Sequence, residues 1–211
     1  MTIILSILMV LAFLFAVFFV KDLDAFYNYY GFSGANLLAR PYVLITSIFM
    51  HAGIEHLLSN LLVFIFFARA VEKEMGPWKM LAIFLLGAIG GDILSLLIYP
   101  FDAISVGASA GIFGLIGVGM LVCPMDLSLY PLIIPIPLVF VGIAYSLYNI
   151  YGFLFLPQSD ISYIGHFGGL FVGLAVGFAK TGFKKGLRTL LLGLLILAMA
   201  IAAWFLISPR L

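Results

Sequence analysis

Residues 105–114 read SVGASAGIFG and contain the pattern G-x-S-x-G, in which Ser109 lies between Gly107 and Gly111. In soluble α/β hydrolases this pattern exposes a nucleophilic serine on a sharp turn between a strand and a helix. Such a fold needs alternating strands and helices around the serine, whereas long apolar runs lie on both sides of it here. The serine therefore belongs to a different architecture.

The composition of the chain predicts an all-α polytopic membrane protein. Of its 211 residues, 65% are hydrophobic and 9% are charged, which is too little polar surface to coat a soluble core. Several apolar runs approach the roughly 20 residues that span a bilayer. The net charge of +1 gives no indication of a nucleic-acid partner. The only cysteine, Cys123, excludes an internal disulfide.

The hydropathy pattern predicts seven helices in a single membrane domain that covers residues 1–211. They are expected at about 2–20, 50–70, 78–99, 109–123, 131–151, 161–179 and 187–207. The first run is interpreted as a retained span rather than a signal peptide, because no basic segment precedes it.

Basic residues predict the orientation of these helices. With a cytoplasmic N-terminus, the basic residues of the inner side outnumber those of the outer side, as is typical of membrane proteins. The inner set is Arg69, Lys73, Lys79, Lys180, Lys184, Lys185 and Arg188, and the outer set is Lys21, Arg40 and Arg210. The loop 21–49 would then lie outside, where its many aromatic rings favour the headgroup boundary. From the compact length we expect a prokaryotic plasma membrane.

The helix that begins at Ser109 is too short to cross a bilayer. Pro124 ends it after 15 residues, which is about 22 Å of helix, against a hydrocarbon layer of roughly 30 Å. Ser109 should therefore lie on the order of 10 Å below the outer surface. The preceding segment 102–108 would be non-helical backbone at membrane depth, which is stable only where protein or water surrounds it.

Two other predicted helices place polar residues at a similar depth. His56 and Asn60 are four residues apart and share one helical face, and His166 lies near the start of the helix 161–179. Singly, each residue has a plainer explanation as interhelical packing or hydrogen bonding. Because polar residues in lipid are costly, several at one level indicate a shared wet cavity.

Small residues would let the helices around this cavity approach closely. One helix carries Gly165, Gly169, Gly173 and Gly177, and the short helix carries Ala110, Gly114 and Gly117. Such spacing is typical of close helix packing in membranes. Packing of the two stripes would bring His166 toward Ser109.

The residue types at this cavity suit acyl transfer. A serine becomes an effective nucleophile when a histidine accepts its proton near neutral pH. The oxyanion that then forms needs preorganised donors. The side chains of His56 and Asn60 could donate, as could the backbone N–H of Ser109 at a helix start.

Several segments of the chain resemble the rhomboid family of intramembrane serine proteases. They are HAGIEHLLSN at 51–60, AVEKEMG at 70–76, GASAG at 107–111 and GHFGG at 165–169. The resemblance covers about residues 40–180 and implies a six-helix core of about residues 1–180, followed by a seventh C-terminal transmembrane helix at about 187–207. It implies that Ser109 is the nucleophile and His166 the general base. His56, Asn60 and Ser109 would form the oxyanion hole.

The resemblance also implies an activity. The protein would hydrolyse peptide bonds in or near the transmembrane segments of single-span proteins within the bilayer, with its active site toward the outer face. The Ser–His dyad would need no acidic third member, no cofactor and no metal. Substrates would enter past the helix 131–151 and the loop 152–160. Many members of the family carry a Trp-Arg pair in the first loop, and the nearest positions here are Tyr42 and Val43. The nearby Arg40 would replace the arginine of that pair only in part.

Two alternative functions stay open. A catalytically inactive rhomboid-like protein would bind membrane clients, but such relatives lack the serine or the histidine, and both are present here. A small transporter would need an inverted repeat or a polar path to the inner face, and neither is visible.

Other polar residues receive plainer interpretations. A metal site is disfavoured, because His51 and His56 are five residues apart, do not share a helical face and form no H-E-x-x-H motif. We expect His51 and Glu55 to be solvated near the membrane surface. Asp92 should lie in the outer half of its helix, and we assign it no catalytic role. The oligomeric state is not predicted.

Overall fold

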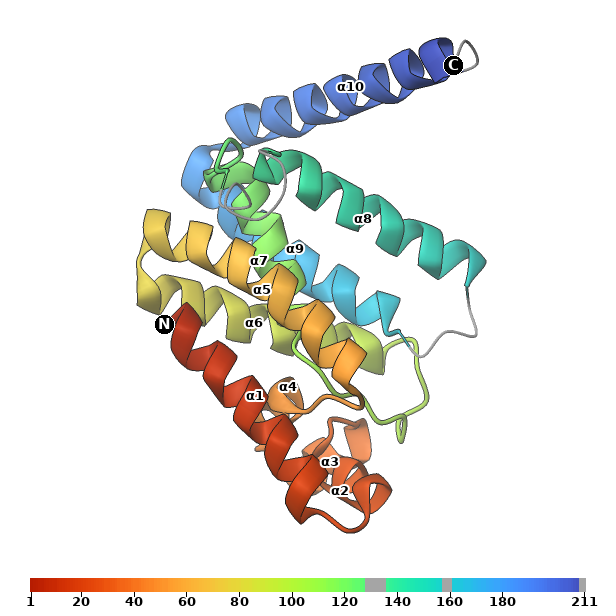
Figure 1. Ribbon diagram of the computed structural model, residues 1–211. Helices are drawn as coiled ribbons and strands as arrows, with labels where there is room; N and C mark the ends of the chain where they lie inside the picture. The colour runs from red at the N-terminus through yellow and green to blue at the C-terminus, as the bar shows by residue number, and fades with distance from the viewer. Residues whose placement is uncertain (128–135, 157–160, 209–211) are drawn as a thin grey trace.

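The chain folds almost entirely into helices (Figure 1). The structure is a computed structural model that describes residues 1–127, 136–156 and 161–208. Within these residues the helices are α1 (Thr2–Phe19), α2 (Leu23–Tyr30), α3 (Gly34–Ala39), α4 (Val43–Phe49), α5 (Ile54–Met75), α6 (Pro77–Leu96), α7 (Ser109–Val122), α8 (Leu138–Phe155), α9 (Tyr163–Thr181) and α10 (Phe183–Ile207). Six of them, α1, α5, α6, α8, α9 and α10, are long and apolar enough to cross a membrane. The protein is therefore an integral multi-pass membrane protein.

All seven predicted helices are confirmed, with shifted ends. The second begins at Ile54 and continues to Met75, where Gly76 adopts a positive φ of 87° and Pro77 starts α6. Glycine tolerates that φ, and proline suits the first turn of a helix, so the two helices are joined by a single residue.

The helix α8 corrects one expectation about the loop 152–160. Residues 152–155 are helical, and buried Gly152 leaves no room for a side chain because the ring of Tyr163 packs against it. The rest of the predicted loop at 157–160, the start of the predicted helix at 131 and the basic residue Arg210 lie outside the described residues.

The short helix α7 occupies the centre of the bundle, in contact with α5, α6, α8 and α9 (Figure 1). Every residue from Gly111 to Leu121 is buried. Phe64 and Phe67 of α5 and Phe84 of α6 are also fully buried in this core. A helix of 14 residues is about 21 Å long at 1.5 Å per residue, so the protein around it must cover its ends.

Close contact between α7 and α9 confirms the predicted packing of small residues. The backbone of Gly169 lies against the carbonyl of Ala110, and that of Gly173 lies against the carbonyl of Gly114. A Cβ atom at Gly117 would come within 2.7 Å of the Leu170 carbonyl oxygen. This contact brings the N-terminal ends of the two helices, which carry Ser109 and His166, to the same part of the bundle.

The first loop folds into the short helices α2, α3 and α4 and docks on the segment that precedes α7. Phe32 and Ser105 exchange two backbone hydrogen bonds of 2.9 and 2.8 Å. The Tyr27 hydroxyl donates to the carbonyl of His51 at 2.9 Å, and burial raises the pKa of Tyr27. Arg40 stays within the loop, because its guanidinium binds Asn36 and lies over the ring of Tyr29. These contacts anchor the loop without a Trp-Arg pair.

The last helix, α10, lies at one edge of the molecule (Figure 1). It follows α9 directly, through Gly182 with a φ of 82°. Contacts with α8 and α9 hold it against the bundle, and most of its side chains are exposed to the surroundings. A mean hydropathy of 2.5 makes this exposed surface suitable for lipid.

Candidate active site

Ser109 is the first residue of α7, as the sequence predicts. Residues 101–108 before it are non-helical; the first four of them are exposed, and burial increases along the segment up to Ala108, which is buried. Gly107 adopts a φ of 121°, which side-chain-bearing residues rarely adopt, and its N–H donates to the Ser47 carbonyl at 2.9 Å. The loop therefore delivers Ser109 to a defined position at a helix N-terminus, where unpaired N–H groups favour negative charge.

His56 and Asn60 lie on α5 against this same loop. A Cβ atom placed on Gly107 would come within 2.8 Å of His56 Nε2 and 3.5 Å of Asn60 Nδ2. Asn60 Nδ2 is buried and has no hydrogen-bond partner in the described part of the chain. A buried donor without a partner costs free energy, and such a donor is what an incoming oxyanion would satisfy. Both side chains reach the loop two residues before Ser109, as their shared helical face predicts.

The expectation that His51 is solvated is wrong. Its side chain is buried, with 1% exposed, and its ring meets that of His56 edge-on with centroids 5.0 Å apart. The two rings meet although the residues are five apart, because His51 precedes α5 and is not bound by helical spacing. Glu55, by contrast, is exposed as expected.

His166 is held in the first turns of α9 by contacts on several sides. Its ring stacks on Phe113 of α7 with centroids 4.3 Å apart and planes inclined by 13°. Tyr163 meets it edge-on at 6.3 Å. Its Nδ1 lies 2.8 Å from Oδ1 of Asn149 on α8. Stacking and hydrogen bonding together fix the plane of the imidazole.

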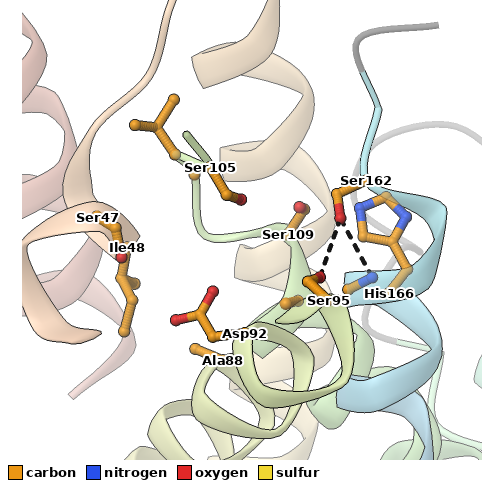
Figure 2. A pocket seen from close by; sticks show the side chains of 13 residues that line it. Ser47, Ile48, Ala88, Asp92, Ser95, Ser105, Ser109, Ser162 and His166 are labelled. Carbon is orange, nitrogen blue, oxygen red and sulfur yellow. Dashed lines mark hydrogen bonds between the residues drawn. The ribbon is translucent and has the colours of Figure 1, made fainter. Parts of the chain in front are cut away.

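Ser109 and His166 line one pocket (Figure 2). The empty space in and in front of the pocket is about 350 Å³, part of it on the open side. Among the described residues no hydrogen bond joins the two side chains. Hydrogen bonds of this kind are often loose or absent until substrate is bound. His56 and Asn60 are outside the lining of this pocket and approach the Ser109 loop from α5.

Asp92 of α6 also lines this pocket, together with Ser95 and Ser162 (Figure 2). The Asp92 Oδ2 atom is buried and lacks a hydrogen-bond partner among the described residues, whereas the hydroxyls of Ser95 and Ser162 are 3.4 Å apart. The carboxyl group of Asp92 thus faces the cavity. No group of three His, Cys, Asp or Glu side chains is arranged to hold a metal ion within residues 1–127, 136–156 and 161–208.

Sequence reasoning missed Asn149 as a member of this site. It is fully buried and contacts His166 directly. The sequence offers one indication of its importance, because a polar residue within an apolar membrane span is costly and needs a partner. That cost alone does not identify the partner.

Comparison with protein families gives an independent result. Residues 38–183 match the Rhomboid domain model. This range includes Ser109, His166, His56 and Asn60, together with helices α4 to α9.

Several curated proteins are similar to parts of the chain. "Rhomboid-like protein 11, chloroplastic" of Arabidopsis thaliana is 34% identical over 105 residues, which cover 50% of this chain and 35% of that protein. "Putative rhomboid protease YdcA" of Bacillus subtilis (strain 168) is 43% identical over 75 residues, covering 36% and 38%. "Rhomboid-like protease 3" of Toxoplasma gondii is 42% identical over 74 residues, covering 35% and 28%. The chain thus aligns with about a third of the length of these relatives.

Proposed function

The chain belongs to the rhomboid family, and from this premise we propose that it is an intramembrane serine protease with Ser109 as nucleophile and His166 as general base. The observation that carries the proposal is that these two side chains, from different helices, line the same pocket of a membrane-spanning bundle. A serine and a histidine in one polar cavity are the minimum set for nucleophilic acyl transfer.

The proposed reaction follows from the chemistry of the two groups. His166 accepts the proton of Ser109 Oγ as this oxygen bonds to the substrate carbonyl carbon. The imidazolium then donates that proton to the leaving amine as the peptide C–N bond breaks. A water molecule attacks the resulting ester, with His166 as base again, and the bond to Ser109 breaks to release the acid.

Three donors are placed to stabilise the oxyanion in this proposal. The backbone N–H of Ser109 is at the start of α7, and the side chains of His56 and Asn60 approach the preceding loop. Donors that are fixed before reaction contribute most, because they do not reorganise as charge develops.

The proposed substrates are single-span membrane proteins cleaved in or near their transmembrane segments. The pocket lies within a bundle of membrane-crossing helices, so a substrate must approach it from the bilayer or its surface. An N-in orientation and a pocket directed to the outer face of a prokaryotic plasma membrane are part of this proposal.

Covalent labelling tests the proposed nucleophile directly. The full chain, purified in detergent, is treated with a small fluorophosphonate, and the intact mass is measured. We expect one adduct in the wild type and none in Ser109→Ala or His166→Ala. An adduct that persists in Ser109→Ala would overturn the assignment. No adduct in a folded wild type whose pocket is open to the probe would favour the client-binding alternative instead.

Asn60→Ala is expected to lower kcat for a transmembrane substrate by roughly 10²–10³-fold, the usual effect of removing one oxyanion donor. The fold should survive, because Asn60 Nδ2 bonds to no described residue. Cleavage is measured with reconstituted protein, and thermal unfolding is followed in parallel. Ser59→Ala, one residue away on the exposed side of α5, is the matched control and should leave kcat unchanged. A wild-type kcat in Asn60→Ala would remove Asn60 from the oxyanion hole.

A further inference from the structure

We propose that Asn149 of α8 is a positioning residue that holds His166 in the tautomer with its proton on Nδ1 and thereby leaves Nε2 free to accept the proton of Ser109. The inference rests on the proposed function. It adds a third residue to the proposed pair of Ser109 and His166, from a helix that carries neither of them. The tautomer itself can be measured without any catalysis.

The side chain of Asn149 bridges α8 and α9. It is 0% exposed. Its Nδ2 donates to the backbone carbonyl of Tyr163 at 3.1 Å, and its Oδ1 is 2.8 Å from His166 Nδ1. Both contacts are buried or nearly so, which makes an unpaired polar atom at either position costly.

These two contacts determine where the proton lies. A backbone carbonyl can only accept, so the group of Asn149 that faces Tyr163 must be the amide NH₂. The amide oxygen is then the atom that faces His166, and an oxygen without a hydrogen needs a donor. His166 Nδ1 must therefore carry the proton. In a neutral imidazole the other nitrogen, Nε2, is then an acceptor.

The contacts of the ring direct Nε2 toward the pocket. Phe113 stacks on one face of His166 and Tyr163 meets it edge-on, so the ring is held in its plane. With Nδ1 bound to α8, Nε2 is the nitrogen that remains for Ser109. Figure 2 shows one nitrogen of His166 on the side of Ser109 and Ser162 and the other on the far side.

A neutral amide suits this position within the membrane. A carboxylate there would be a buried charge, which is costly in an apolar environment. An amide orients the imidazole through one hydrogen bond and adds no charge. Asn149 belongs to α8, so the tautomer of His166 depends on α8 lying against α9.

The tautomer is measured by ¹⁵N NMR of the full chain, labelled at histidine and solubilised in detergent. The sequence has only three histidines, and His166→Ala identifies the signals of His166. We expect a protonated Nδ1 and an unprotonated Nε2 in the wild type. Asn149→Leu, which keeps the approximate size but removes the acceptor, should give a mixture of tautomers. A protonated Nε2 in the wild type, or an unchanged tautomer in folded Asn149→Leu, would overturn the inference.

The same variants separate positioning from packing in an activity assay. Asn149→Leu should lower kcat roughly 10- to 100-fold, in line with the loss of one buried hydrogen bond, with little change in KM. Asn149→Gln keeps both the amide donor and the oxygen acceptor and adds no charge, so it should retain the Nδ1 proton and more of kcat than Asn149→Leu does. Equal losses in both variants would indicate a packing role only. Where Asn149→Leu fails to fold, Asn149→Ala takes its place.

A control and a second readout keep the two proposals distinguishable. Ser146→Ala removes a polar group one turn away on α8 whose hydroxyl bonds within its own helix to Gly142, and it should behave as wild type. If the fluorophosphonate fails to label Ser109 while the tautomer responds to Asn149 as expected, the proposed protease function fails and the positioning role stands. If labelling succeeds and the tautomer does not change in the Asn149 variants, the proposed protease function stands and the positioning role fails.

Discussion

Ser109→Ala is expected to abolish cleavage of a transmembrane substrate, with kcat reduced by on the order of 10⁴–10⁶-fold. Alanine has no atom that can bond to the substrate carbonyl carbon, so the covalent route is closed. The remaining donors around Gly107 and His56 can polarise a carbonyl but cannot replace a nucleophile. The measurement is cleavage of a reconstituted single-span protein, followed by the mass of its products.

The same substitution should leave the fold unchanged. Ser109 is half-buried at the first position of α7, and its neighbours Ala108 and Ala110 are already alanines. Removing one hydroxyl there opens no cavity in the close contact of α7 with α9. The midpoint of thermal unfolding should therefore match the wild type.

Ser6→Ala is the control for Ser109→Ala, because Ser6 lies on α1 and its hydroxyl bonds only to the Thr2 carbonyl among the described residues. It should cleave as the wild type does. Substantial cleavage by Ser109→Ala would place the nucleophile elsewhere. A large fall in thermal stability would show instead that the serine has a structural role. The loss of activity would then not identify Ser109 as the nucleophile.

The parts of the structure that depend on local periodicity could be predicted from the sequence. Apolar runs located seven helices, and glycine spacing located the contact between α7 and α9, because both signals repeat along one helix. Ser109 was placed at a helix start for the same reason. Helix ends were less accurate, as at Ile54 and Phe155, since hydropathy does not mark where backbone hydrogen bonding stops.

The parts that depend on contacts between distant segments could not be predicted. His51 is buried because the first loop folds back over it, with Tyr27 bound to its carbonyl. Asn149 meets His166 because α8 packs on α9, and nothing near residue 149 in sequence indicates that pairing. Asp92 was placed in the outer half of its helix, but its direction into the pocket follows only from how α6 is rotated.

Gly173→Ala is expected to destabilise the protein by about 3 kcal/mol, at the upper end for overpacking. A Cβ atom there would overlap the Gly114 carbonyl oxygen and would lie 2.8 Å from its carbon and 3.0 Å from the Gly114 Cα. These are backbone atoms of a fully buried helix, so they cannot rotate away. The unfolding midpoint should fall by roughly 5–10 °C, and labelling of Ser109 should weaken as α7 and α9 separate.

Gly177→Ala is the matched control for Gly173→Ala, because it adds the same methyl group to the same face of α9 one turn further on. There the new Cβ atom would meet only the side chain of Leu121, at 2.7 Å from Cδ1, 3.3 Å from Cγ and 3.0 Å from Cβ. A rotamer change relieves the first two contacts, and the contact with Cβ needs a small shift of the helices. We expect a much smaller loss of stability and normal labelling. Equal damage at both positions would mean that α9 tolerates no added volume anywhere on this face. Wild-type stability in Gly173→Ala would mean that the α7–α9 backbone contact does not set the distance between Ser109 and His166.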